Sequence, residues 1–383
     1  MTIDTSYQDS LPFLFSGNAG SIRISASPNE AVPVTIELRC EHKKPGEDDA
    51  VLYHTDFELK TGSDGMLDLD LSKIFGALDH MLPTVTDQAV VHGFNWDNYY
   101  VIMFLGKDRR IWMKTVIPGK PDDTFLADIY GGRSFITARP QISTARTDGQ
   151  PDWLPFYGGK DTDWAEVMAT VYSDMLPPLQ VLLRQIIGVS MLSKTDVSLD
   201  AVRKAADKAG LAGHRITAYD IHLESSVRDD DGNVTETVKS ETLRFIVPDR
   251  KATVFEFVSS VGAMETVYAT GRRKTELESE ASSFTNGGVE TELVNDWRIT
   301  HETFTGHLAS ADEVRFWREF FASSKRYAVV DGEPLRIAVT EIDAESTEGE
   351  LGAFSFKWRF ADRYADPARK AARRELKQFR PKI

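Results

Sequence analysis

The sequence has a single cysteine and none of the short motifs that mark the commonest enzyme sites. Cys40 stands alone among 383 residues, so a disulfide within the chain and a multi-cysteine metal site are both excluded. The patterns G-x-S-x-G, G-x-G-x-x-G and G-x-x-x-x-G-K-S/T are also absent. The sequence therefore has no signature of a serine-hydrolase nucleophile elbow, of a dinucleotide-binding site or of a phosphate-binding loop. We therefore expect no cofactor, no metal and no enzymatic activity.

Long apolar runs are also missing. No stretch approaches the roughly 18 apolar residues that cross a bilayer. The first residues, "MTIDTSYQDSLPFLFSG", lack both a basic beginning and a long apolar core. We therefore expect no secretion signal and no membrane span. The expected location is the cytoplasm or a particle assembled there.

Positive charge is scarce except at the C-terminal end. The chain carries 45 Lys and Arg against 59 Asp and Glu, a formal net charge of -14. Phosphate binding needs a cationic face, so we do not expect nucleic-acid binding. From Pro367 onward there are seven Lys or Arg and one acid, Glu375, a net charge of +6. We expect this basic arm to dock on a neighbouring subunit through Arg369, Arg373 and Phe379, or otherwise to be a solvated end.

What the chain does contain is alternating hydrophobicity, which predicts half-buried strands. In "PVTIELRC" the residues Val34, Ile36, Leu38 and Cys40 share one face. We expect a mainly β, multi-domain protein with β-sandwich-like domains and a few short helices. The expected parts are an N-terminal β domain (1–135), a middle β-rich domain (136–275), a helix-plus-hairpin module (276–365) and the basic arm (366–383).

Capping residues locate three helices. Ser72, Ser198 and Ser310 each precede a segment with helical spacing of apolar residues, and each is predicted to be the N-cap. Glu313 follows Ser310 at the spacing of a capping box. The aromatic face of "FSFKWRF" is expected to pack on the helix over 310–324, and Asp331-Gly332 is expected to turn a hairpin.

The histidine and carboxylate patterns do not complete a metal or catalytic site. His301-Glu302 begins H-E-x-x-H, but residue 305 is Thr and the segment is predicted to be a strand. His222-x-Glu224 lacks the cysteine pair that a zinc deaminase needs. The 59 acidic residues single out no acid–base pair, although a hydrolase with an unrecognised carboxylate site stays open as a third alternative.

An aromatic cluster lies in the turn-rich stretch from Phe135 to Gly159. Trp153, Phe156 and Tyr157 stand close together between prolines and glycines. The cluster is either an ordered, packed corner between domains or a platform on which a sugar stacks. The platform would make the chain a carbohydrate-binding or adhesin-like β-sandwich protein with a carbohydrate receptor.

Three stretches resemble known sequences. "FVSSVGAMETVYATG" and the C-terminal region from "NDWRITHETFTGHL" to "FSFKWRFADRY", together with the N-terminal "FLFSGNAGSIRISA", are similar to uncharacterised tail-region structural proteins of phages and prophages of gut anaerobic bacteria. The resemblance implies a virion component near the tail tip or baseplate, assembled in the bacterial cytoplasm. It also implies a homo-oligomer with other phage structural proteins as partners. No functional residue is transferred by it.

Overall fold

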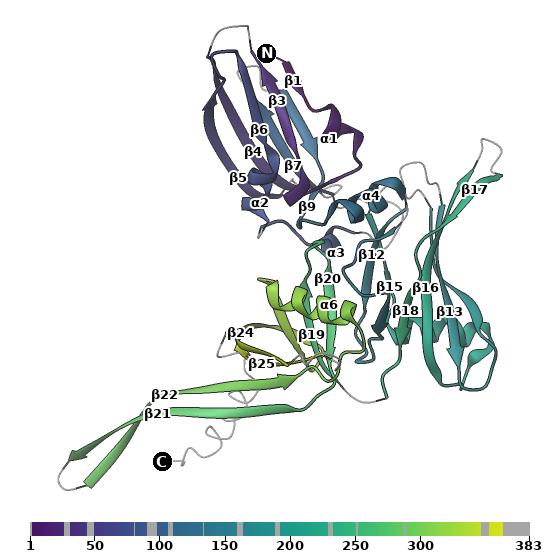
Figure 1. Cartoon of the computed structure of the whole chain (residues 1–383), viewed down its shortest axis with the longest axis vertical. Helices are drawn as coiled ribbons and strands as arrows, with labels where there is room; N and C mark the ends of the chain where they lie inside the picture. The colour runs from purple at the N-terminus through teal and green to yellow at the C-terminus, as the bar shows by residue number, and fades with distance from the viewer. Residues whose placement is uncertain are drawn as a thin grey trace, which may run out of the picture. The chain divides into compact units, whose positions relative to one another are not determined.

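The computed structural model of the chain is built mainly from β-strands. It describes residues 2–26, 31–43, 50–79, 81–89, 98–105, 110–132, 134–158, 164–187, 192–228, 233–249, 252–286, 289–345 and 352–362. Short helices lie between the strands (Figure 1). The predicted mainly β class is confirmed.

The chain divides into two compact units. The first unit comprises Met1–Val247 and Val258–Glu265, and the second comprises Pro248–Phe257 and Thr266–Ile383. The first unit therefore includes the expected N-terminal region and most of the expected middle region, whereas residues 248–257 and 266–275 of that middle region belong to the second unit. The expected boundary at 275/276 falls within the strand β21 (Arg273–Asn286).

Two sheets begin the first unit. In order across the sheets, their strands are β5 (Ala50–Lys60), β4 (Pro33–Lys43), β7 (Asn98–Leu105) and β8 (Arg110–Lys114) in one, and β1 (Thr2–Asp4), β3 (Ser21–Ser25) and β6 (Met66–Asp70) in the other. Alternate residues of β3, β4 and β7 enter one shared core, as the period-two pattern predicts. Burial there raises the pKa of the Cys40 thiol to about 11, so this cysteine is a core residue.

The helix α2 (Leu71–Leu78) begins two residues earlier than an N-cap at Ser72 would place it. Its N-cap is Asp70, whose carboxylate accepts hydrogen bonds from the backbone N–H groups of Ser72 and Lys73. The prediction that Ser72 is the N-cap is wrong. Its hydroxyl instead accepts a hydrogen bond from Gly20 N–H, at 3.0 Å. The carboxylate of Asp70 can accept from the same unpaired N–H groups at the helix start as the hydroxyl of Ser72. The sequence pattern alone does not distinguish these two N-cap candidates.

A second core of the first unit joins short elements. These are β2 (Leu14–Phe15), α3 (Val85–Gln88), β9 (Val116–Ile117) and α4 (Asp123–Gly132), and η1 (Ser16–Asn18) follows β2 directly. Phe15, Ile117 and Tyr157 meet there with Val261 and Ala263, all at most 4% exposed. The core thus brings together segments from both ends of the unit's sequence.

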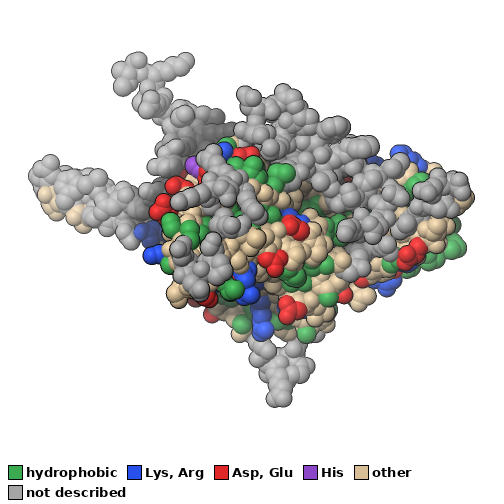
Figure 2. All heavy atoms as spheres, turned by 90° about the horizontal axis from the view of Figure 1, so that it is seen from above, with side chains coloured by type: hydrophobic (Ala, Val, Ile, Leu, Met, Phe, Trp, Pro, Cys, Tyr) green, Lys and Arg blue, Asp and Glu red, His purple; other side chains and the backbone are tan. Residues whose placement is uncertain are grey.

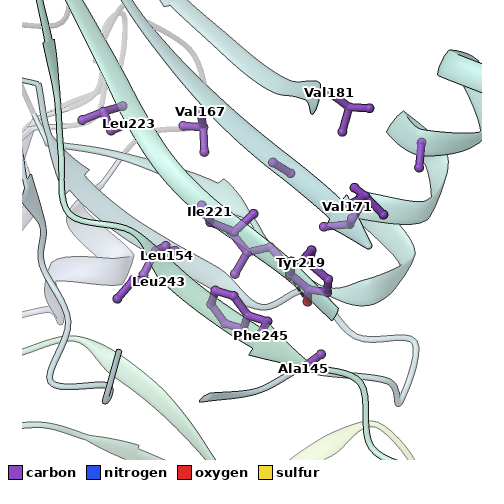
Figure 3. Close-up of a cluster of buried hydrophobic side chains, with 14 of the residues drawn as sticks. Ala145, Leu154, Val167, Val171, Val181, Tyr219, Ile221, Leu223, Leu243 and Phe245 are labelled. Atoms are coloured by element: carbon purple, nitrogen blue, oxygen red, sulfur yellow. Dashed lines mark hydrogen bonds between the residues drawn. The ribbon is translucent and has the colours of Figure 1, made fainter. Parts of the chain in front are cut away.

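The remaining strands of the first unit surround a third core, shown in Figure 3. They are β10 (Ser134–Phe135), β12 (Trp153–Tyr157) and β15 (Leu192–Asp196) in one sheet, and β11 (Ile142–Thr144), β18 (Leu243–Ile246), β16 (Ile216–Arg228), β13 (Trp164–Ser173), β14 (Leu179–Ile187) and β17 (Val234–Lys239) in another. The helix α5 (Leu199–Ala206), with η2 (Asp207–Leu211), packs against them. Ser198 caps α5 by accepting a hydrogen bond from Ala201 N–H, which confirms that prediction.

In the second unit, α6 (Ala311–Ala322) packs on an aromatic sheet face. Among the described residues the sheet order is β20 (Met264–Ala269), β19 (Thr253–Val258), β23 (Arg326–Val330), β24 (Glu333–Glu345), β25 (Ala353–Phe360), β22 (Val289–Phe304) and β21. Ser310 caps the helix, and Trp317 lies 5.8 Å from Phe356 between ring centroids. The predicted packing is confirmed, as is the turn at Asp331-Gly332, where both φ angles are positive.

Replacing Trp317 by Ala should destabilise the second unit by about 3–5 kcal/mol, the usual cost of truncating a buried aromatic side chain. Trp317 is only 4% exposed and its ring also contacts Phe320 and Phe321. A denaturant titration measures the change in the free energy of unfolding. Arg318→Ala, on the exposed face of the same helix, is the matched control. A loss below about 1 kcal/mol for Trp317→Ala would contradict this packing.

Candidate functional site

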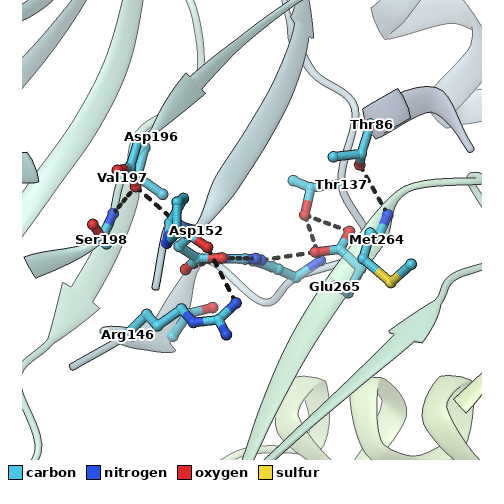
Figure 4. A network of polar contacts seen from close by, with 12 residues as sticks. Thr86, Thr137, Arg146, Asp152, Asp196, Val197, Ser198, Met264 and Glu265 are labelled. Atoms are coloured by element: carbon cyan, nitrogen blue, oxygen red, sulfur yellow. Dashed lines mark hydrogen bonds and ion pairs between the residues drawn. The ribbon is translucent and has the colours of Figure 1, made fainter. Parts of the chain in front are cut away.

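A network of buried charged side chains lies in the first unit (Figure 4). The Arg139 guanidinium donates from Nη1 and Nη2 to both carboxylate oxygens of Asp152, at 2.8 and 2.6 Å. Its Nε donates to Glu265 Oε2 at 2.7 Å. All three side chains are 2% exposed. One guanidinium therefore bridges two carboxylates inside the protein.

Consecutive backbone and side-chain donors position Glu265. Thr137 Oγ1 and Ala138 N–H donate to Glu265 Oε1 at 2.8 and 2.9 Å, just before the contact from Arg139. Pro140 follows Arg139 and disfavours the helical conformation for it, which suits an extended segment that presents three donors in sequence. The carboxylate is thus held by every residue of this short segment.

The second carboxylate of the network is tied to the start of α5. Asp152 N–H donates to Asp196 Oδ1 at 2.9 Å, and Ser198 N–H donates to the same oxygen at 2.9 Å. Val197 N–H donates in turn to Asp152 O at 2.9 Å. Asp152 is therefore fixed on its backbone as well as through Arg139.

The same network secures the tip of the β19–β20 hairpin. Val85 N–H donates to Gly262 O at 2.8 Å, and Met264 N–H donates to Thr86 Oγ1 at 3.0 Å. Gly262 has φ +73°, and a Cβ there would lie 1.9 Å from Pro118 O, so a side chain cannot be accommodated. Close backbone packing and the Glu265 carboxylate together hold the tip in the first unit.

The electrostatics of the network indicate a structural role. Burial raises the pKa of Glu265, while the Arg139 charge and the hydrogen bonds to its carboxylate oppose that rise. Breaking a buried pair is costly because one charge is left without compensation. Since the three side chains are almost fully covered, a substrate does not reach them in this conformation. The arrangement stabilises the fold and offers no exposed acid or base.

Replacing Glu265 by Ala should destabilise the first unit by about 3–5 kcal/mol, because Arg139 loses one of its two buried carboxylates. Glu265→Gln keeps hydrogen-bonding groups at the same place, and Asp152 still neutralises Arg139, so we expect a smaller loss of about 1–2 kcal/mol. Urea titration measures both changes.

Glu58→Gln, at an exposed position of β5, is the control and should change stability by less than about 0.5 kcal/mol. Equal losses for Glu265→Ala and for this control would contradict the role assigned to the network.

The aromatic residues predicted as a contact site occupy different environments. Phe156 and Tyr157 are 0% and 1% exposed, and their rings pack edge-on against Phe135 and Phe13. Trp153 is half-buried, with Lys194 Nζ 5.3 Å from its ring centroid. Leu154, Pro155, Phe156 and Tyr157 of β12 are all buried although successive side chains point to opposite faces, so both faces of the strand are covered there. Two of the three rings are therefore core residues with no surface on which a ligand could stack.

The other predicted contact residues, Arg369, Arg373 and Phe379, lie outside the described residues. Their proposed docking stays a prediction from the sequence.

The histidines singled out in the sequence are buried in polar or aromatic surroundings. His222 is 2% exposed and its Nε2 lies 2.9 Å from Glu224 Oε1. His301 stacks on Trp358 with ring centroids 4.4 Å apart, and its Nδ1 lies 3.2 Å from Arg273 Nη2. Burial and then the Arg273 charge lower the pKa of His301 to about 4. Within the described ranges no group of three or more His, Cys, Asp or Glu is arranged to hold a metal ion.

The second unit should lose stability as pH falls from 6.5 to about 4, because the unfolded chain protonates His301 in this range while the folded unit does not. We expect a loss of roughly 2 kcal/mol, measured by denaturant titrations across the range. His301→Phe keeps an aromatic ring without the titrating group and should flatten this dependence. The exposed His307→Gln should leave it unchanged. The same slope in wild type and His301→Phe would refute the assignment.

A long two-stranded ribbon extends from the sheet of the second unit (Figure 1). β21 and β22 pair from Arg273↔Thr303 to Asn286↔Val289, whereas β25 pairs with β22 only over His301–Phe304. Among the described residues, Glu276–Asn286 and Val289–Thr300 therefore pair only with each other. At ~3.3 Å per residue, this part is roughly 35–40 Å long. A register shift between Glu280 and Ala281 marks a bulge, which increases the local twist.

Sequence comparisons identify no related protein. The chain matches no protein-family model, and no curated protein matches it significantly. In the described part of the chain, no helix is both long enough and apolar enough to span a membrane.

The sequence pattern predicted neither the buried network of Arg139, Asp152 and Glu265 nor the length of the β21–β22 ribbon. Glu265 stands in an otherwise apolar strand segment, which is a signal for a paired buried acid, but nothing in the sequence identifies Arg139 as its partner. The β21 segment is polar on both faces of the pattern, so alternation did not predict it as a strand.

Proposed function

We propose that the protein is a structural component of a phage tail or tail-like particle, in the tail-tip or baseplate region. It assembles through its β-rich units and does not catalyse a reaction. The observation that carries the proposal is the β21–β22 ribbon, whose outer part pairs with no other described strand of its own sheet. The resemblance of the sequence to phage tail-region proteins supports the same assignment.

The ribbon suits contact between subunits because of its backbone. An isolated two-stranded hairpin is marginally stable in water. Among the described strands none pairs with the outer edges of the ribbon, and a free strand edge is a template for pairing with another chain. Pairing with a neighbour occupies such an edge and stabilises the ribbon, as in strand addition to an exposed sheet edge.

The charge of the ribbon sets the kind of partner. Between Glu276 and Thr300 the sequence has six acidic residues and one basic residue, Arg298, which gives a net charge of -5. Like charges discourage pairing of two ribbons with each other. The segment from Pro367 to Ile383, with its net charge of +6, has the opposite sign. We assign the basic arm of a neighbouring copy as the partner, with charge guiding the encounter.

The rest of the visible surface is mixed in charge. On the face shown in Figure 2, acidic, basic and hydrophobic side chains of the described residues are interspersed. Nucleic-acid binding requires a continuous basic face. The mixed surface seen here does not concentrate positive charge. The described part of this face therefore offers no site for a nucleic acid.

Shortening the ribbon should prevent assembly while both units stay folded. Ala281 and Val294 are directly opposite, so residues 282–293 can be replaced by Asn-Gly, which favours a two-residue hairpin turn. We expect the shortened protein to remain a monomer under conditions in which the full chain forms rings or tail-like particles. Truncation after Tyr364 should have the same effect, because it removes the basic partner. Mass measurement in solution and negatively stained images report the outcome.

The matched control shortens another hairpin. Val227 and Glu236 are directly opposite in β16 and β17, and replacing residues 228–235 by Asn-Gly should leave assembly intact. A full chain that stays monomeric, or a shortened ribbon that assembles normally, contradicts the proposed function. Normal assembly of the truncated chain alone contradicts the assignment of the basic arm as partner.

A further inference from the structure

A polar pocket opens on the solvent-facing side of the β1–β3–β6 sheet, beside the helix α1 (Ser6–Ser10). Its volume is about 310 Å³, at the lower end of the range of small-ligand sites. It is lined by Asp4, Ser6, Tyr7, Gln8, Ser21, Ile22, Arg23 and Asp68. None of these residues belongs to the buried network or to the ribbon.

A row of three charged residues crosses the pocket. Asp4 lies directly opposite Arg23 in the β1–β3 pairing, and Arg23 lies directly opposite Asp68 in the β3–β6 pairing. Arg23 Nε and Nη2 donate to the two Asp68 oxygens at 2.7 and 3.1 Å. Asp4 Oδ1 instead accepts from Ser6 Oγ at 2.7 Å and Ser6 N–H at 3.1 Å. The row thus presents acceptor, donor and acceptor in sequence, with a net charge of -1.

Tyr7 provides an aromatic surface at the edge of this row. Its side chain is 57% exposed, and it is the only strongly exposed aromatic residue among those whose burial the structure describes. Gly20, with φ +72°, lies beside the ring, since a Cβ built there would be 3.5 Å from Tyr7 Cε1. An exposed ring next to polar groups is the form in which aromatic side chains contact ligands with one apolar side.

The helix that carries Tyr7 is short, but the two residues after Tyr7 anchor it to neighbouring segments. Gln8 is 1% exposed, and its Nε2 donates to Ala19 O and Ser21 O at 3.2 and 3.1 Å. Trp112 Nε1 donates to Asp9 Oδ1 at 3.0 Å. These bonds fix the backbone that carries Tyr7 before a ligand arrives, which lowers the entropic cost of binding.

We propose that this pocket binds a neutral pyranose ring of a carbohydrate. The Tyr7 ring packs on the apolar C–H side of the sugar. Neighbouring hydroxyl groups donate to the Asp4 and Asp68 carboxylates and accept from the Arg23 guanidinium, whose N–H groups can bind two oxygens at once. The site goes beyond the proposed assembly function and does not depend on it.

The charges of the pocket favour a neutral ligand over an ion. The net negative row repels phosphate, sulfate or a uronic acid, and the pairing of Asp68 with Arg23 weakens its attraction for an ammonium group. Hydrogen bonding to Ser6 lowers the pKa of Asp4, and hydrogen bonding to Arg23 lowers that of Asp68. Both carboxylates are therefore ionised acceptors at neutral pH.

Saturation-transfer NMR on the full chain tests the proposal. The probes are the methyl pyranosides of glucose, galactose and mannose, with N-acetylglucosamine as the fourth. We expect transfer to at least one of them, strongest at the ring C–H protons that face Tyr7. The Nε–H resonance of Arg23 should shift during the titration.

Variants locate the binding in this pocket. Tyr7→Ala should weaken binding by about tenfold or more, while Tyr7→Phe keeps the ring and should stay within about twofold. Asp68→Asn should also weaken binding. Ile111→Ala, at an exposed position of β8 in the same unit, is the control and should change nothing. Thermal unfolding verifies that each variant is folded.

Three results would overturn the proposal. They are no transfer to any of the four sugars, transfer that Tyr7→Ala and Asp68→Asn leave unchanged, and a shift of the Arg23 resonance by inorganic phosphate or tetramethylammonium in place of the sugars. A chain that binds the sugar but stays monomeric retains this site and loses only the assembly function.

Discussion

The first unit depends on the pairing of one buried guanidinium with two carboxylates. Arg139 stays protonated even when buried, so its charge must be neutralised where it lies. Asp152 is near in sequence, but Glu265 is 126 residues away. The chain leaves the first unit at Val247 and returns for Val258–Glu265, so this unit is incomplete without the hairpin tip. Val261 and Ala263 of the same tip enter the second core. The tip is therefore held by apolar packing as well as by the ion pair of Glu265 with Arg139.

The two proposed surfaces use different parts of the β-strand. The ribbon offers backbone edges, which pair with any extended chain, and its acidic sequence then selects a partner by charge. The pocket at Tyr7 offers side chains placed by strand register, with Asp4, Arg23 and Asp68 in one row. A backbone edge suits a permanent contact between subunits, whereas a rigid polar pocket suits a small ligand. One chain can therefore assemble and bind a sugar without the two functions competing for the same residues.

Much of the fold was predictable because it follows local rules. The alternation in β4, the N-caps at Ser198 and Ser310, and the turn at Asp331-Gly332 each depend on a few consecutive residues. Where two neighbouring residues could serve the same role, local reasoning failed, as at Asp70 and Ser72. The burial of Phe156 and Tyr157 shows a further limit. Successive side chains of this strand point to opposite faces and both faces are buried, but its own sequence does not say what packs on either face.

The candidate sites were not predictable, because each depends on register between distant segments. The patterns "SIRIS" and "MLDLD" predict that Arg23 and Asp68 point away from the core, and no more. Only the pairing of β1, β3 and β6 sets these residues directly opposite each other, and a shift of one residue would turn every side chain to the other face. The same holds for Arg139 and Glu265, which are 126 residues apart in the sequence. They meet only because the tip of the β19–β20 hairpin packs beside the extended segment that carries Arg139. In this protein the chemistry is carried by the pairing of strands and not by any contiguous motif, which is why a search for motifs does not find it.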